Sequence, residues 1–302
     1  MPDRLRLGAT ALAVIALSGC ATGYPAKQIA KTGAALGAVQ TTFADYYGNL
    51  NALRRDAYIR SQVYRGQTVN GGDPALKGSI YPDDAIQARL AALDVVGRYT
   101  KLLDAYASGS QAKDVGAAVG GLSDGLFALQ ARMAAAGDDA GLAAYKAPVS
   151  DLVTAVSTWI VDARLRSGFK ASIGATTPKV RKVLELLKAD AANVLQPTKQ
   201  MDSHREFADL VTYYNDNAGK LDPAQRAALA TALIDSAAAR DANEAIDLVG
   251  IVTAADKAVA ALQKNIDGAA TPAETRAAVD EFAARVTRLK AIVDKLDAAR
   301  KR

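Results

Sequence analysis

The stretch "AIDLVGIVTAADKAVAALQKNI", residues 245–266, carries the pattern that decides the fold. Its apolar residues return at alternating steps of three and four. The series is Ala245, Leu248, Val252, Ala255, Val259, Leu262 and Ile266. Steps that average about 3.5 residues place these side chains on one face of an α-helix. Such a stripe stays against a neighbour when helices supercoil left-handedly, so the stretch predicts a helix in a coiled-coil-like bundle.

The same period continues through most of the chain. A second series runs from Val279 to Leu296, and a third runs from Ile29 to Tyr64, which corresponds to roughly 60 Å of helix. Shorter series begin at Ile86, Val115, Leu152 and Val180. Alternation typical of β-strands is nowhere sustained. We therefore predict an all-α fold, an elongated bundle of about seven helices with left-handed, coiled-coil-like packing.

Prolines and capping residues indicate where the helices begin. Asp222-Pro223, Thr271-Pro272 and Thr177-Pro178 each place a capping residue before a proline, which is typical of a helix start. Pro148 and Pro197 instead fall within helical patterns. Because proline lacks the backbone N–H that an internal helix position needs, we predict a kink or break at each.

Composition fits closely packed helices and argues against one class of partner. The chain of 302 residues contains 66 alanines, which favour helix and add little bulk. The net charge is +5, but charges of both signs are spread along the chain. Nucleic-acid binding needs a clustered basic stripe, so we expect no nucleic-acid partner. Residues 27–302 are expected to form the bundle, either as one domain or as two subdomains that divide near residues 169–177.

The amino-terminal residues have the three-part layout of a secretory signal. Arg4 and Arg6 are followed by an apolar stretch, Leu7–Leu17, and then by the small pair Ser18-Gly19. The apolar stretch is about half the roughly twenty residues that a membrane-spanning helix needs. The chain's only cysteine, Cys20, comes directly after the small pair.

Leu17-Ser18-Gly19-Cys20 resembles the lipobox of bacterial lipoprotein precursors. The resemblance implies that residues 1–19 are a signal peptide that is removed and that Cys20 is the site of lipidation, with palmitate among the attached chains. Two or three acyl chains would anchor the protein stably in a membrane lipid surface. Residues 20–26 would then be the lipidated cysteine and a short tether. Ala21 in place of aspartate implies the outer membrane, facing the periplasm.

No group of side chains forms a recognisable catalytic, cofactor or metal site. The single histidine, His204, lacks the additional ligands of a zinc site. Asp83-Asp84 and Asp138-Asp139 are interpreted as first-turn residues of helices rather than as paired catalytic carboxylates. Four glycines between Gly116 and Gly125 lie in a helical period and are interpreted as a site of close helix packing. We expect no cofactor.

Two regions are candidates for a binding surface. Seven of the eleven tyrosines lie between Tyr46 and Tyr106, and arginines accompany them. The arginines are Arg54, Arg55, Arg60 and Arg65. Tyrosine and arginine are common at interaction hot spots, although the simpler interpretation is that these rings lie in the core with their hydroxyls at its rim. The segment Gly66–Tyr81 lacks a helical period and is interpreted as a crossing connection rather than a functional loop.

The leading hypothesis is therefore a non-catalytic envelope lipoprotein. It would be anchored to membrane lipid through acylated Cys20 and would have a structural, scaffolding or partner-binding role, with a protein or a cell-wall component as partner. An enzyme that acts on the cell wall is the alternative, and a deep pocket with convergent acids of shifted pKa would favour it. A small-ligand carrier or sensor is a further alternative, which an unfilled alanine-lined cavity on the bundle axis would favour.

Overall fold

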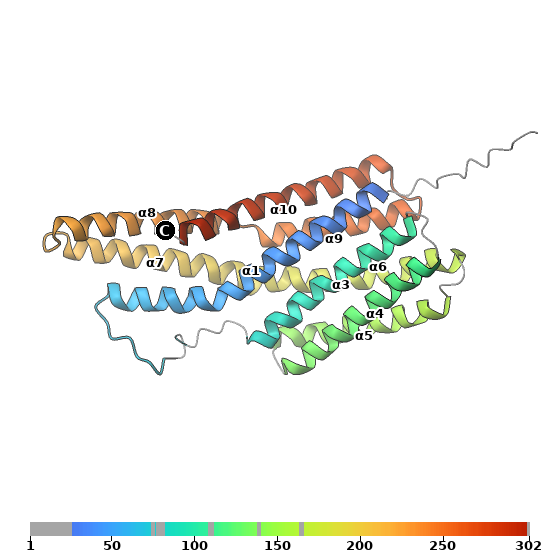
Figure 1. Cartoon of the computed structure of the whole chain (residues 1–302), viewed down its shortest axis with the longest axis horizontal. Helices are drawn as coiled ribbons and strands as arrows, with labels where there is room; N and C mark the ends of the chain where they lie inside the picture. Colours follow the sequence, from blue (N-terminus) through green and yellow to red (C-terminus); the bar gives the residue numbers. More distant parts are fainter. Residues whose placement is uncertain are drawn as a thin grey trace, which may run out of the picture.

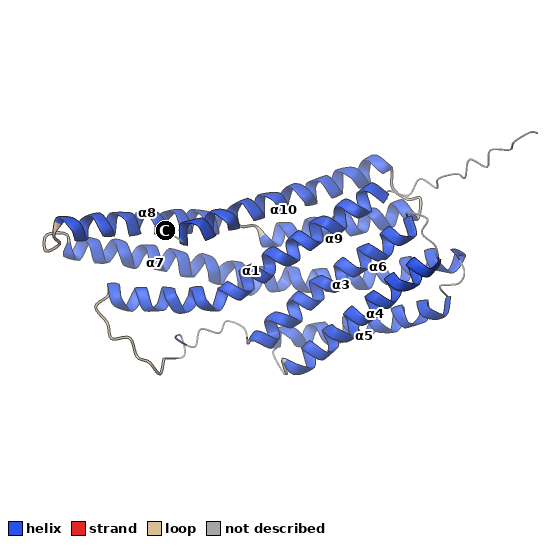
Figure 2. Cartoon of the chain, in the orientation of Figure 1, coloured by secondary structure: helices blue, strands red, loops and turns tan. Residues whose placement is uncertain are grey.

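The computed structural model describes residues 26–73, 76, 82–107, 112–137, 140–162 and 166–300. Within these ranges the chain is helical and contains no strand (Figure 2), so the all-α prediction is confirmed. The helices are α1 (Ala26–Tyr64), α3 (Asp83–Ala107), α4 (Ala112–Ala135), α5 (Ala140–Asp162), α6 (Arg166–Asp190), the π-helical turn η1 (Ala191–Leu195), α7 (Gln196–Asn217), α8 (Pro223–Glu244), α9 (Leu248–Ile266) and α10 (Pro272–Arg300). They form an elongated bundle (Figure 1).

Helix α1 is a single rod of 39 residues, which confirms the long helix predicted from Ile29 to Tyr64. Its first part packs against α3, α9 and α10, and its later part lies beside α7 (Figure 1). The helix ends where Gly66 adopts a φ of 63°, a left-handed conformation that glycine takes without strain. One helix therefore joins the thick part of the bundle to its narrower end.

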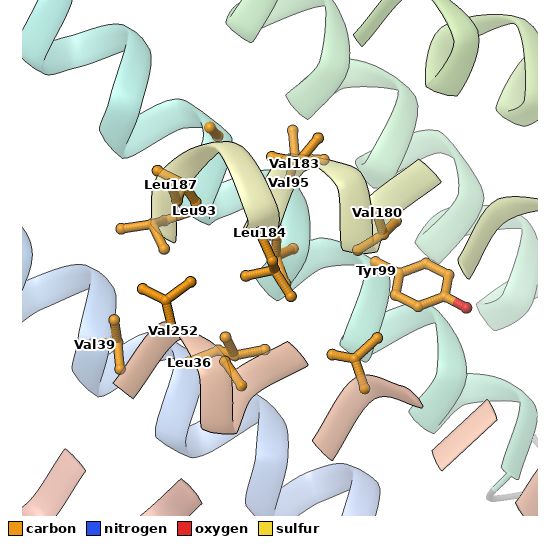
Figure 3. Packing of buried hydrophobic residues seen from close by; sticks show 14 of the residues in the cluster. Leu36, Val39, Leu93, Val95, Tyr99, Val180, Val183, Leu184, Leu187 and Val252 are labelled. Carbon is orange, nitrogen blue, oxygen red and sulfur yellow. The ribbon is translucent and has the colours of Figure 1, made fainter. Parts of the chain in front are cut away.

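The apolar stripe of residues 245–266 forms the centre of the core. On α9, Val252, Val259 and Leu262 are buried, and Phe282 of α10 is buried with them. Figure 3 shows Val252 packed near side chains of α1, α3 and α6. Burying a side chain of this size contributes about 1.5–3 kcal/mol, so the repeated stripes supply the main force that holds the helices together.

Helices α6, η1 and α7 follow one another without a loop, and the predicted helix start at Thr177-Pro178 is wrong. The three segments contain 25, 5 and 22 residues, so they make a rod of roughly 80 Å at about 1.5 Å per residue. The rod passes uninterrupted through residues 169–177. Thr177 is buried, and its hydroxyl donates to the carbonyl of Ile173, 2.9 Å away, inside α6. This internal bond replaces the capping role that the sequence suggested.

Other helix boundaries agree with the sequence. Asp222 forms a capping box with Gln225 at the start of α8, and Thr271 and Glu274 exchange equivalent bonds at the start of α10. The predicted disturbance near Pro197 is present as the π-helical turn immediately before α7. A proline ring crowds the carbonyl four residues earlier, which accounts for the widened turn at this position.

Some sequence predictions lie outside the described residues. Residues 1–25 are among these, and they include the signal segment and Cys20. Asp138-Asp139 and part of the Gly66–Tyr81 segment also lie there. Among the described helices, none combines the length and the apolarity needed to cross a membrane.

Candidate functional site

The narrow end of the bundle is built from α7 and α8, the later part of α1 and the end of α10 (Figure 1). Helix α8 turns toward its neighbours a stripe in which residues recur at steps of four, three and four. The stripe consists of Ala232, Ser236, Ala239 and Asn243. A coiled-coil helix would place leucine or valine at such positions. Because these side chains are small or polar, the four helices leave space between them.

That space is a groove of about 450 Å³, open to solvent on one side. Leu210 of α7 and Val293 and Leu296 of α10 supply its apolar surface. Polar and charged side chains line the rest. These are Asp45, Tyr46, Asp56, Arg60 and Tyr64 from α1, Lys199, Ser203 and Glu206 from α7, and Asp235 from α8. The lining therefore combines a small apolar surface with many polar and charged groups.

The two cationic side chains of the lining already have partners. The Arg60 guanidinium lies against the Glu206 carboxylate, with Nε and Oε1 2.7 Å apart and Nη2 and Oε2 3.2 Å apart. The Lys199 ammonium lies over the Tyr46 ring, 5.2 Å from its centroid. Both contacts join α1 to α7, so they hold two walls of the groove together.

Several acceptors of the lining have no such partner. Within the part of the chain that the structure describes, Asp45 and Asp235 have no ion-pair partner. Asn243 is only 6% exposed, and its Oδ1 accepts no hydrogen bond from the described residues. A buried amide oxygen without a donor costs about 1–3 kcal/mol, so this position lowers the stability of the narrow end.

Two tyrosines complete the lining, and both keep their hydroxyl protons at neutral pH. Burial raises the pKa of Tyr46, and the nearby Asp202 carboxylate raises it further. Burial also raises the pKa of Tyr64, partly opposed by the Arg60 charge. The two phenols are therefore neutral groups that can donate a hydrogen bond or present a ring face to a ligand.

One carboxyl close to the groove has a shifted pKa but does not line it. Burial raises the pKa of Asp202, and the charges of Arg54, Lys199 and Arg205 oppose this effect. Asp202 lies one helical turn before Glu206 on α7. The arrangement therefore differs from the pair of convergent, shifted acids that would favour a hydrolytic enzyme.

The tyrosine- and arginine-rich region divides between the core and the groove. Tyr47 and Tyr99 are buried in the core, while Tyr46, Tyr64 and Arg60 line the groove.

Two other residues that the sequence singled out lie away from the groove. His204 is on the surface and pairs with Glu244 at 2.8 Å. Tyr58 donates to Asp73 at 2.7 Å and so ties residue 73 of the 66–81 segment to α1.

The glycines of α4 also have an identifiable neighbour. An added Cβ at Gly125 would lie 2.5 Å from Cδ of Arg98, a residue of α3. The same arginine donates from Nη1 to the carbonyl of Gly121 at 2.9 Å. Gly121 and Gly125 therefore accept a long side chain from the next helix, whereas Gly116 and Gly120 have open space beside them.

The core contains a buried ion pair that the sequence did not indicate. The Arg89 side chain is completely buried, and its Nε and Nη2 donate to the two oxygens of Asp190 at 2.7 and 3.2 Å. Tyr47 donates to the same carboxylate at 3.4 Å. Asp190 is the last residue of α6, next to the π-helical turn, so this network joins α1, α3 and α6 at that point.

Comparisons with protein-family models, with curated proteins and with solved structures find no match for this chain. No group of three or more His, Cys, Asp or Glu side chains suited to a metal ion occurs among the described residues. The groove between α1, α7, α8 and α10 is therefore the candidate site that the geometry itself supplies.

Proposed function

We propose that this chain is a non-catalytic envelope lipoprotein whose helical bundle binds a ligand or partner in the groove between α1, α7, α8 and α10. The observation that carries the proposal is the groove itself, a space of about 450 Å³ beside the small residues of α8. Anchoring through acylated Cys20, in the outer membrane and facing the periplasm, is proposed from the lipobox resemblance.

The position of the groove along α1 suits an anchored binding protein. Helix α1 begins at Ala26, and its groove-lining residues extend from Asp45 to Tyr64. At about 1.5 Å per residue, these residues lie roughly 30–57 Å along the helix from its start. A membrane anchor six residues before Ala26 would therefore leave the groove well away from the lipid surface and accessible to partners.

A carrier or sensor of a small ligand is the candidate role that the groove's size favours. Its volume falls within the roughly 300–1,000 Å³ that small-molecule sites occupy. Two alanines, Ala232 and Ala239, lie in its wall among mainly polar and charged side chains. A purely structural bundle has no need of such a space, since filling it would add stability.

Anchoring is tested by Cys20→Ser in the bacterial host. We expect the variant to lose palmitate labelling and to appear in the soluble fraction after membranes are sedimented, because no thiol remains to accept the lipid. Full labelling of the variant would refute the anchoring proposal.

Binding in the groove is tested by crosslinking in living cells. A p-azidophenylalanine at Tyr64, which lines the groove, should give a crosslinked product that a second substitution, Ala239→Leu, removes by filling the space. The same probe at Tyr214, a residue of α7 outside the lining, is the matched control and should give none. A product that persists in full after Ala239→Leu would contradict the proposed role of the groove.

A further inference from the structure

We infer that the groove binds a small organic cation, a protonated amine carried on an apolar body. This inference rests on the proposed function, because it assigns a ligand class to the same groove. It follows from the carboxylates of the lining that have no ion-pair partner among the described residues and from the apolar and aromatic side chains of the walls.

The excess of carboxylates in the lining disfavours the binding of an anion. Four carboxylates line the groove, Asp45, Asp56, Glu206 and Asp235, against the two cations Arg60 and Lys199. Arg60 is held by Glu206 at 2.7 Å, and Lys199 lies on the Tyr46 ring. An anionic ligand would have to displace one of these contacts and would also face the remaining carboxylates. Like charges at such distances are repelled, so an anion is disfavoured on both counts.

The carboxylates of Asp45 and Asp235 favour the binding of a cation. Asp56 is bonded to Arg55 at 3.1 Å, but Asp45 and Asp235 have no ion-pair partner among the described residues. Asp235 is half-buried on α8, one residue before Ser236 in the groove stripe. A half-buried carboxylate is less screened than a surface one, so an ammonium placed against it would form a charge-assisted hydrogen bond.

Asn243 lies in the groove wall near these carboxylates, but its amide oxygen is enclosed by protein. Its side chain lines the groove, is only 6% exposed, and leaves Oδ1 without a donor among the described residues. Native proteins rarely leave such an acceptor unsatisfied.

The walls suit an apolar body next to the charge. Leu210, Val293 and Leu296 form an apolar surface, and Tyr46 and Tyr64 add aromatic rings. The Lys199 ammonium on the Tyr46 ring shows that a ring face of this groove already accepts a cation. An amine with an aryl or alkyl body would therefore find both parts of its structure complemented.

The test uses three probes of equal size that differ in charge: 4-phenylbutylamine, 4-phenylbutan-1-ol and 4-phenylbutyrate. Binding of each to the purified protein is measured by calorimetry and by ligand-observed NMR. We expect the amine to bind at least about tenfold more tightly than the alcohol, since charge-assisted bonds are roughly twice as strong as neutral ones. The acid should bind more weakly than either.

Two variants locate the interaction, and a third is the control. Asp235→Asn keeps the shape of the groove and should weaken amine binding by about tenfold while leaving alcohol binding unchanged. Ala239→Leu should abolish binding of all three probes without lowering the unfolding temperature. Asp216→Asn makes the same change of charge on α7 outside the lining, and amine binding should not change.

The outcomes separate this inference from the proposed function. Equal binding of all three probes, lost in Ala239→Leu, would overturn the cation assignment and leave the groove as an apolar binding site. Preference for the acid, or amine binding that Asp235→Asn does not weaken, would overturn the assignment in the same way. Probe binding that Ala239→Leu leaves intact, or no binding of any probe, would overturn both.

Discussion

Removing one member of the buried Arg89–Asp190 pair should strongly destabilise the fold. The Arg89 side chain is 0% exposed and the Asp190 side chain is 7% exposed, so neither charge can regain water when its partner is lost. Breaking a buried pair from one side typically costs about 3–5 kcal/mol, because the other charge stays behind in a medium of low dielectric constant. We expect a loss of that size for Arg89→Met and for Asp190→Leu alike.

The double variant tests whether the loss of stability comes from the charge that stays buried or from the missing contact itself. In Arg89→Met combined with Asp190→Leu, no charge remains buried, and apolar side chains of similar volume occupy the site. Such replacements are often neutral or stabilising by about 1–4 kcal/mol. The two single losses should therefore be far from additive, and the double variant should be close to the parent in free energy of unfolding.

A matched surface pair provides the control. Arg181 and Asp256 also form a two-bond contact, at 2.6 and 2.8 Å, but their side chains are 40% and 24% exposed. Removing Asp256 should cost only about 0–1 kcal/mol. The free energy of unfolding of these four variants and of the parent is measured by urea unfolding, followed by far-ultraviolet circular dichroism. If Arg89→Met loses no more stability than the Asp256 variant does, the argument from burial is wrong.

Two further predictions concern the helices. Gly116→Ala should raise the free energy of unfolding by about 0.5–1 kcal/mol, because open space surrounds that helical glycine. Gly125→Ala should bring no such gain, because Arg98 occupies the space beside it. Equal gains for the two variants in urea unfolding would contradict the role given to Arg98. Hydrogen bonds from Thr271 lower the pKa of Glu274 in the folded protein below its usual 4.5. The ionised carboxylate therefore contributes its full stabilisation of the fold above pH 4.5, and this contribution is lost as the pH falls through the lowered pKa. Glu274→Gln should therefore lose less stability than the parent on acidification below pH 4.5, as measured by urea unfolding at several pH values.

Most of the architecture could be predicted because periodic apolar stripes leave few alternatives. A helix such as α9, with Val252, Val259 and Leu262 on one face, must cover that face with other helices to be stable in water. The caps at Asp222 and Thr271 were equally predictable, since each bond spans three residues and depends on local sequence alone. Local causes of this kind are visible in a single sequence.

Predictions failed where a distant residue decides the outcome. Thr177-Pro178 has the form of a helix start, yet burial of Thr177 against Tyr99, with their oxygens 2.5 Å apart, keeps it inside α6. Arg89 has the form of a surface residue on α3. Its partner, Asp190, lies 101 residues later in the chain, and nothing near either residue indicates the pairing. The tertiary environment overrides local preference at both positions.

The groove is a third case. The periodic stripe on α8 is visible in the sequence, but whether it fills or leaves space depends on the volume of its side chains. The α8 stripe from Ala232 to Asn243 has the same period as the α9 stripe from Leu248 to Ile266. Period alone predicts which face of a helix turns inward, and both faces do turn inward. Side-chain volume then decides whether that face fills the interior, as α9 does, or leaves a space, as α8 does beside α1, α7 and α10. Along a chain of regular helices, an inward stripe of alanine, serine and asparagine therefore leaves a space where a stripe of leucine would fill a core.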